Sequence, residues 1–171
     1  MSQDRLIAVD VETTGFSPAQ GDRVIEIGAV IMENGKVTGE FHSLINIGMR
    51  IPHSASRVHG ITEDMLIGNP VPEKVYPRFK DFIGRNILLA HNAQFDVRFL
   101  RYEFARLGLG LNNRYLCTLE MCRKRYPRLP DHRLETVSRH LLGQEPDEIH
   151  LHRALDDARM VARIWLEMMK Q

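Results

Sequence analysis

Short apolar runs separated by turn residues divide the first half of the chain into predicted strands. The pair Asn34-Gly35, between the second and third runs, is typical of a hairpin turn. Helical spacing precedes the fourth run, from about Glu73 to Ile83. The four runs are Leu6–Val11, Arg23–Met32, Lys36–Asn46 and Asn86–His91.

The second half of the chain mainly predicts helices. Apolar residues recur there at the three- and four-residue spacings of a helix face, in one helix beginning near Phe95 and in another at the C-terminus. Three consecutive strands followed by alternating helix and strand predict an α/β fold, with a central mixed sheet flanked by helices. The two apolar faces are Val97, Leu100, Phe104 and Leu107, and then Ala158, Val161, Trp165 and Met168.

Composition limits the class of protein. A length of 171 residues predicts one domain, 1–171, that can bury a core without a disulfide or a structural metal. With 43% hydrophobic and 26% charged residues, the chain is neither disordered nor a disulfide scaffold. The net charge is +1, so binding a polyanion would need a local patch. Arg114–Arg133, with six basic and two acidic residues, fits either a path for phosphates or a solvated helix face.

Cysteine usage and the termini bear on location. Cys117 and Cys122 form no CxxC motif and suggest neutral thiols in a reducing compartment. No signal-peptide core and no apolar run of about 20 residues is present, so we expect a cytoplasmic protein without membrane association. The sequence stops at Gln171 without a Gln- or Pro-rich tail, which favours a free-standing enzyme or an excised domain.

The first chemical signal is Asp10-Val11-Glu12, at the end of the first predicted strand. Residues two apart on a strand point to the same face, and paired carboxylates there need a cation or water. Solvated strand-end acids are the plainer interpretation of this motif alone. Thr13-Thr14-Gly15 follows and either contacts a phosphate or simply makes a turn.

Two further acids begin helices. Asp96, in the first turn of its helix, shares the apolar stripe and is therefore expected to face a cleft rather than open water, although the helix dipole also favours it. Near the C-terminus, Asp156 and Asp157 open the last helix. His152 is expected on the preceding loop, because residues five apart, such as His152 and Asp157, do not lie on the same face of a helix.

Together these segments bring four carboxylates and a histidine from three parts of the chain. No cysteine or second spaced histidine accompanies them, so an all-oxygen set suits two divalent cations, Mg²⁺ or Mn²⁺, rather than zinc. Two such ions about 3.5–4 Å apart can activate water and stabilise the leaving oxygen of a phosphoester.

The same three segments resemble a known family. DVETTG at 10–15, HNAQFD at 91–96 and HRALDDA at 152–158 are similar to the three motifs of the DEDD 3′–5′ exonucleases. That family includes the proofreading epsilon subunit of bacterial DNA polymerase III, RNase T and oligoribonuclease. A histidine five residues before the last Asp, with Arg153 where the other branch has tyrosine, indicates the histidine branch.

The resemblance implies a ribonuclease-H-like fold and assigns the site. It implies two metals held by four acids, with His152 as general base and Asp156 outside the ligand set. Arg57–Thr62 resembles the family's VHGIT loop, which implies that His59 and Ile61 pack against the 3′-terminal base. The implied metal ligands are Asp10, Glu12, Asp96 and Asp157, and the residues implied around the scissile phosphate and sugar are Thr13, Thr14, Gly15, Asn92 and Phe95.

The function expected from this resemblance is a metal-dependent 3′–5′ exonuclease. Its substrates would be single-stranded or frayed 3′ ends, with DNA favoured, and its products nucleoside 5′-monophosphates. The alternatives are an exoribonuclease of the same family, a proofreading subunit docked on a DNA polymerase, and a binding module without turnover.

Overall fold

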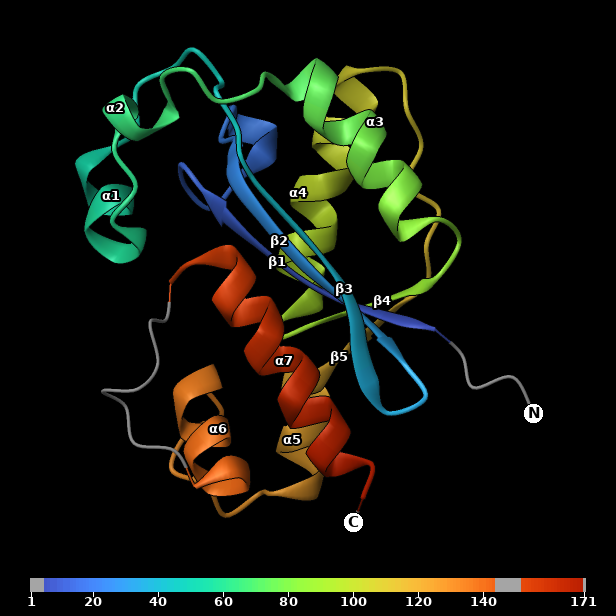
Figure 1. The fold of residues 1–171 in the computed structure, drawn as a ribbon. Helices are drawn as coiled ribbons and strands as arrows, with labels where there is room; N and C mark the ends of the chain where they lie inside the picture. Colours follow the sequence, from blue (N-terminus) through green and yellow to red (C-terminus); the bar gives the residue numbers. More distant parts are fainter. Residues whose placement is uncertain (1–4, 144–151, 171) are drawn as a thin grey trace.

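A five-stranded mixed sheet forms the centre of the molecule, in the order β3-β2-β1-β4-β5 (Figure 1). The computed structural model describes residues 5–143 and 152–170. β1 pairs antiparallel with β2 and parallel with β4, while β2–β3 is an antiparallel hairpin and β4–β5 is parallel. The strands are β1 Leu6–Thr13, β2 Val24–Glu33, β3 Lys36–Leu44, β4 Ile87–Ala90 and β5 Tyr115–Cys117.

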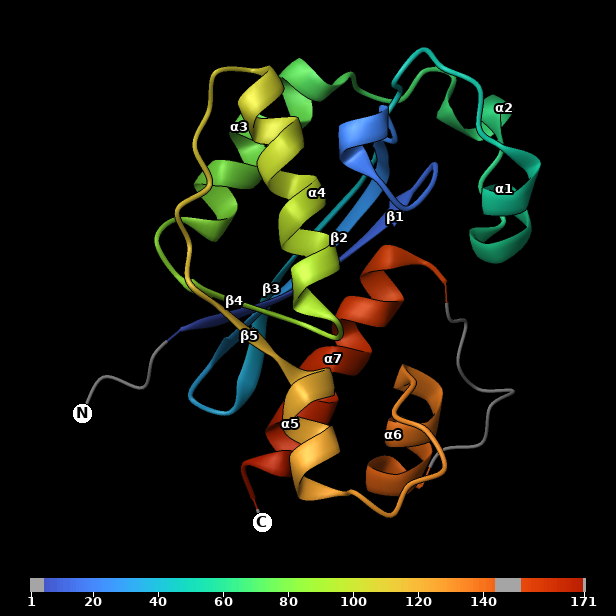
Figure 2. The ribbon, with the colours of Figure 1, turned by 180° about the vertical axis from the view of Figure 1, so that it is seen from behind.

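Helices cover both faces of this sheet, with α3 and α4 on one side and α7 on the other (Figures 1 and 2). α5 and α6 pack beside α7 in a separate apolar cluster, while α1 and α2 lie beyond one end of the sheet. The helices are α1 His53–His59, α2 Glu63–Leu66, α3 Pro72–Ile83, α4 Ala93–Arg106, α5 Thr118–Arg125, α6 Leu134–Leu142 and α7 Ala154–Met168.

The alternation along β1 separates the core from the chemistry. Ile7, Val9 and Val11 are buried in the cluster that contains α3 and α4. Ala8 packs in the opposite cluster against α7, and the strand period of two turns Asp10 and Glu12 to that same face. The start of α7 therefore meets the acidic end of β1.

Gly28 of β2 allows α7 to approach the sheet closely. A Cβ atom at this position would lie 2.2 Å from the Ala154 carbonyl carbon and the Leu155 nitrogen, far inside contact distance. The first turn of α7 consequently rests directly on the β2 backbone.

The predicted fold class is confirmed, and four predicted strands are present with shifted ends. β1 runs two residues past Val11 because Glu12 and Thr13 still pair with β2. The three-residue strand β5 and the short helices α1 and α2 were not predicted from the pattern.

Cys117 and Cys122 are free thiols, and burial raises the pKa of Cys122 to about 11. Among the described helices, none combines the length and apolarity that crossing a membrane requires.

Candidate active site

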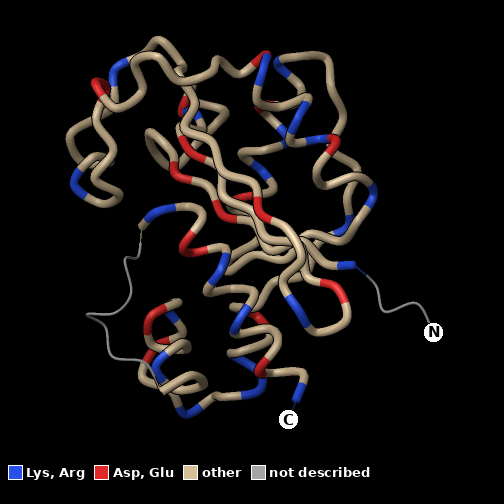
Figure 3. Tube along the Cα trace, in the orientation of Figure 1, with Lys and Arg blue, Asp and Glu red and all other residues tan. Residues whose placement is uncertain are grey.

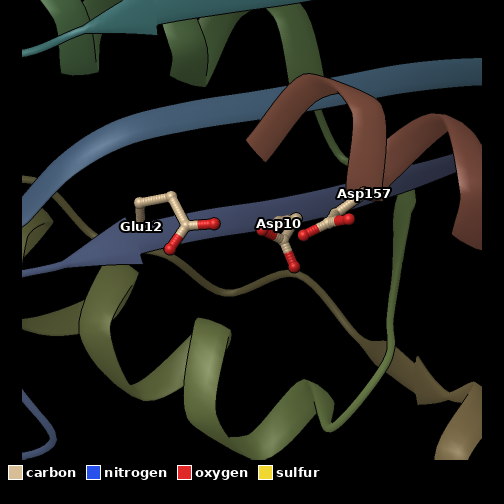
Figure 4. Close-up of side chains that lie close together, drawn as sticks. All are labelled: Asp10, Glu12 and Asp157. Atoms are coloured by element: carbon tan, nitrogen blue, oxygen red, sulfur yellow. The ribbon is translucent and has the colours of Figure 1, made fainter. Parts of the chain in front are cut away.

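Three carboxylates from two elements meet at the acidic end of β1 (Figure 4). Asp10 and Glu12 extend from β1, and Asp157 reaches them from the first turn of α7. One oxygen from each lies within 4.8 Å of the others. Three like charges at this spacing repel each other, so the arrangement favours protons or a bound cation between them.

Asp96 joins this acidic trio from the opposite side of β1. It is only 3% exposed, and its Oδ1 accepts a hydrogen bond of 3.2 Å from the Val11 backbone nitrogen. Its charge acts on Asp10, so the fourth predicted ligand lies close to the trio while one of its oxygens is held by the strand. The structure brings Asp10, Glu12 and Asp157 together, and it places Asp96 near enough for its charge to act on Asp10.

Burial and mutual repulsion raise the pKa of every acid in this site. Burial is the largest cause for each, and it raises the pKa of Glu12 and of Asp96 to about 8 and that of Asp157 to about 7. For Asp10 burial raises the pKa well above its ordinary value, and neighbouring carboxylates raise it further. These acids hold protons in the metal-free protein that a divalent cation would displace.

One oxygen of Asp157 is bonded to the turn before α7, and the other is not bonded within residues 5–143 and 152–170. Oδ2 accepts a hydrogen bond of 3.0 Å from the His152 backbone nitrogen, but the buried Oδ1 has no partner among the described residues. A buried carboxylate oxygen without a donor is costly unless a ligand satisfies it. This orphaned oxygen and the all-oxygen donor set fit a hard divalent cation such as Mg²⁺ or Mn²⁺.

His152 lies on the turn just before α7, as predicted. Its backbone has a left-handed φ of 68°, and its nitrogen is bonded to Asp157. Its ring is half exposed, and Nε2 lies 3.9 Å from Glu135 Oε1 of α6. The backbone is therefore tied to a predicted metal ligand, while the ring is only loosely held.

Glu26 is a fifth acid beside the trio that the sequence analysis missed. It is the register partner of Glu12 on β2 and is fully buried. Both of its oxygens accept hydrogen bonds, from the Arg153 side chain and the Ala154 backbone nitrogen. Although burial opposes it, hydrogen bonds from His42, Arg153 and Ala154 lower its pKa to about 2. A carboxylate so fully bonded is a support for the site rather than a metal ligand.

The hydroxyls of Thr13 and Thr14 hold the turn after β1. Thr13 Oγ1 donates to the Gly15 carbonyl at 2.7 Å, and Thr14 Oγ1 accepts from the Arg23 backbone nitrogen at 2.9 Å. A Cβ at Gly15 would lie 2.4 Å from the Asp22 carboxylate, so a larger residue there would displace the Asp22 side chain. Both hydroxyls are thus used inside the turn, and their contact with a phosphate stays a prediction.

His59 and Ile61 differ in what they offer a substrate. His59 Nδ1 accepts from the Ile61 nitrogen at 3.0 Å, so the neutral ring carries its proton on Nε2, and burial lowers the pKa of His59. That Nε2 has no partner among the described residues. Ile61 is 0% exposed and packs with Ile25 and Leu66. The expected contact of Ile61 with a base is therefore corrected to a core position beneath the loop.

Residues at the start of α4 frame Asp96. Asn92 has a left-handed φ of 77° and an exposed side chain, while the ring of Phe95 is half-buried with its centroid 4.9 Å from that of Phe99. His91, the first residue of the motif, contacts Thr118 Oγ1 at 2.9 Å and the His132 carbonyl at 2.7 Å. His91 thus ties the end of β4 to α5 and to the following loop, while Asn92 stays open to solvent.

Three features surround the site: an exposed aromatic ring, a partly exposed aspartate and the distribution of basic residues. Phe16, one residue after Gly15, is 83% exposed, and its place directly behind the first motif is the only sequence signal for it. The Asp156 side chain is partly exposed and accepts a hydrogen bond from Arg159 Nη1 at 2.9 Å, in agreement with its predicted solvent position. Lys and Arg residues lie mainly on the helices and loops around the acidic sheet, including the exposed end of α5 (Figure 3).

Comparison with known proteins shows which family this chain resembles. The exonuclease family model named for RNase T matches residues 7–165. The epsilon subunit of DNA polymerase III from Aquifex aeolicus is 34% identical over 166 residues, covering 96% of this chain and 80% of that protein. A PolC-type DNA polymerase III from Clostridium perfringens is 36% identical over 162 residues, covering 94% of this chain but only 11% of that protein.

A solved structure agrees with these sequence matches. Exonuclease X in complex with duplex DNA carrying a 5′ overhang superposes with a TM-score of 0.76 and 28% identity. The superposition covers 96% of this chain and 91% of that one. The likeness thus extends over the whole sheet and its flanking helices.

Proposed function

This chain belongs to the RNase T exonuclease family, and we propose that it hydrolyses phosphodiester bonds stepwise from the 3′ end of single-stranded or frayed DNA. The observation that carries this proposal is the acidic trio, in which the buried Oδ1 of Asp157 has no partner within the described part of the chain. The products are a nucleoside 5′-monophosphate and a strand shortened by one residue.

Four carboxylates are proposed to hold the metals. Asp10, Glu12 and Asp157 already lie within reach of a shared ion, and Asp96 keeps one oxygen free of the Val11 nitrogen for a second. Two bound divalent cations, Mg²⁺ or Mn²⁺, would stabilise the negative charge that develops on the phosphate and the leaving oxygen. The identity of the cation is part of the proposal.

His152 is proposed as the base that takes a proton from the attacking water. The water oxygen forms a bond to phosphorus, the bond from phosphorus to the 3′ oxygen breaks, and that oxygen leaves on the shortened strand and is protonated by solvent. The half-exposed ring supports this assignment, because Glu135 Oε1 at 3.9 Å is too distant to hold the ring against rotation towards a bound phosphate.

The terminal nucleotide is proposed to lie between α1 and the start of α4. The ring of His59 lies beside the Thr13 backbone, and its Nε2 has no hydrogen-bond partner among the described residues. Asn92 and Phe95 offer an exposed amide and a half-exposed ring. Phe16 adds an exposed aromatic surface on which a base could stack. DNA is favoured because the curated relatives are DNA polymerase III proteins and exonuclease X was solved with DNA. Docking on a polymerase, the single domain 1–171 and a cytoplasmic location remain predictions.

The test is a panel of matched DNA and RNA oligonucleotides with Mg²⁺ or Mn²⁺ and with chelator. We expect metal-dependent loss of single nucleotides from free 3′ ends, protection by a blocked 3′ end, and faster loss from an unpaired end than from a paired one. A paired end must first melt, at a cost of a few kcal/mol. Cutting of a circular single strand at a comparable rate would contradict an exonuclease, and faster degradation of RNA would favour the exoribonuclease alternative.

A further inference from the structure

The carboxylate of Glu26 is enclosed by donors from two other elements. Arg153 NH2 donates to Oε1 at 2.8 Å, and Arg153 Nε lies 3.1 Å and 3.3 Å from the two oxygens. The Ala154 backbone nitrogen donates to Oε2 at 3.0 Å, and His42 Nε2 lies 2.7 Å from Oε1. Glu26 is 0% exposed, so breaking these contacts would leave a buried charge without partners.

These contacts hold Arg153 and Ala154, the two residues that follow His152. Arg153 is the N-cap residue of α7 and has no side-chain cap bond to its own helix, so its guanidinium is free to bind Glu26. The Ala154 nitrogen is one of the unpaired donors at a helix start, and Glu26 satisfies it from the neighbouring strand. The beginning of α7 is therefore bonded to β2 and not only packed on it.

The turn that is held in this way carries both His152 and Asp157. His152 has a left-handed φ, which costs free energy in a residue other than glycine and persists only where neighbours hold it. Its nitrogen donates to Asp157 Oδ2, while the Asp157 nitrogen donates to the Arg153 carbonyl at 3.0 Å. Contacts that fix Arg153 thus fix the residues on either side of it.

Gly28 removes the remaining freedom of this turn. It lies two residues from Glu26 on the same face of β2, directly beneath the peptide bond between Ala154 and Leu155. The backbone contact at Gly28 and the bidentate ion pair between Arg153 and Glu26 together fix the position of the start of α7 on the sheet.

We propose that Glu26 is a positioning residue, which sets the geometry of His152 and Asp157 by holding Arg153 and the Ala154 nitrogen. Glu26 is not among the proposed metal ligands, because its oxygens are already bonded to Arg153, Ala154 and His42. The proposal deepens the proposed exonuclease function and rests on it for its effect on turnover, but not for its effect on the structure of the turn.

The primary test is Glu26→Gln, which keeps the shape of the side chain and removes its charge. We expect kcat on a 3′-terminated oligonucleotide to fall about tenfold or more, with KM changed by less than about threefold, because misplacement by a fraction of an ångström mainly affects the reacting groups. Hydrogen exchange of the His152 amide, followed by NMR without substrate, should become about tenfold faster.

Glu40→Gln is the matched control. Glu40 of β3 binds Arg159 of the same helix through two hydrogen bonds, at 2.8 Å and 2.7 Å, but six residues beyond Arg153 and on the exposed surface. The Glu40→Gln substitution removes an ion pair between the sheet and α7 and leaves the contacts of the turn at His152 and Arg153 in place. We expect its kcat and its His152 exchange to match the unmodified protein at a temperature where all variants are folded.

Arg153→Gln provides a second route if Glu26→Gln does not fold. It removes the same ion pair from the half-exposed partner, whose side chain is 38% exposed, and should reproduce both effects. In the double variant the losses should not add, since both residues act through one contact. Normal kcat together with slow His152 exchange in either variant overturns the proposal, as does an equal loss in Glu40→Gln. If the unmodified protein cleaves no 3′ end, the proposed function fails, whereas the exchange measurement still decides the positioning role.

Discussion

Glu12 and Glu26 are register partners on β1 and β2, and their carboxyl groups have pKa values shifted in opposite directions. Burial and neighbouring acids raise the pKa of Glu12 to about 8, whereas hydrogen bonds lower that of Glu26 to about 2 despite its burial. Two identical side chains on one face of the sheet thus differ in their hydrogen-bond partners, and Glu26 is also the more deeply buried of the two. One is left available for a cation, and the other has its charge already used.

Neutralising an acid of the site should abolish cleavage without unfolding the protein. For Asp157→Asn we expect turnover to fall about 10³-fold or more, because several kcal/mol of charge stabilisation depend on the ligand set. Asp10→Asn, Glu12→Gln and Asp96→Asn should behave alike in a nuclease assay with Mg²⁺. Asp156→Asn is the control and should stay active, since Asp156 binds Arg159 instead. Near-normal activity in two of the four variants would refute the metal assignment.

The metal-free protein should lose stability as the pH rises from about 5 to about 8. The pKa values of Glu12, Asp96 and Asp157 are raised on folding, so the folded state holds more protons than the unfolded chain in this range. Each extra proton lowers the free energy of unfolding by about 1.4 kcal/mol per pH unit. Chemical denaturation at several pH values measures this slope.

Mg²⁺ and a neutral side chain should each reduce that slope. Binding of the cation replaces the protons, and Asp96→Asn removes one titrating group, so the metal-free variant should gain about 1–3 kcal/mol at pH 8. Stability that rises with pH across this range in the metal-free protein would contradict the raised pKa values.

His152→Ala should lower turnover roughly 10²–10⁴-fold, the usual effect of removing a general base. Binding of Mn²⁺, followed by calorimetry, should change little because the ring of His152 is not among the proposed ligands. His53→Ala, which removes another exposed histidine, serves as the control. An ordinary rate in His152→Ala at every pH would remove the base from the mechanism.

Phe16→Ala should weaken the binding of single-stranded DNA. Stacking of a base on an aromatic ring contributes about 1–3 kcal/mol, so we expect KM to rise roughly 5- to 150-fold with a smaller change in kcat. Ile67 is also apolar and 73% exposed, and Ile67→Ala should leave KM unchanged. Equal effects of the two substitutions would assign Phe16 no specific contact.

Ile61→Ala should act on stability before it acts on the substrate. The side chain is fully buried among Ile25, Ile51 and Leu66, so its truncation should cost about 2–5 kcal/mol in the free energy of unfolding. A thermal denaturation series measures this loss. A stable variant with a large increase in KM would instead restore the predicted contact with the terminal base.

The sequence pattern predicted the sheet and the ligands better than the surroundings of the site. β1 to β4 and the two long helices α4 and α7 follow from strong periodicity, whereas β5 has three residues and depends on pairing with β4. The acids were found because charges at strand ends and helix starts are conspicuous in an apolar pattern.

Residues whose role depends on distant partners could not be assigned in this way. Glu26 stands in an almost entirely buried strand, and only the approach of Arg153, 127 residues away, shows what its charge does. The hydroxyl of Thr14 is used by Arg23 and Asp22, nine and eight residues along the chain. Ile61 was assigned from motif likeness, while its burial depends on Ile25 of β2.

The close seating of α7 on Gly28 has a consequence for protein engineering. A graft of DVETTG, HNAQFD and HRALDDA onto another sheet would carry the four proposed ligands but not the surface that aligns them. The smallest transferable unit includes the β2 segment from Glu26 to Gly28, because any residue with a Cβ at position 28 would push the helix off the strand. A designer who transplants this site should therefore move β1 and β2 together with the first turns of α4 and α7, and should keep glycine at position 28.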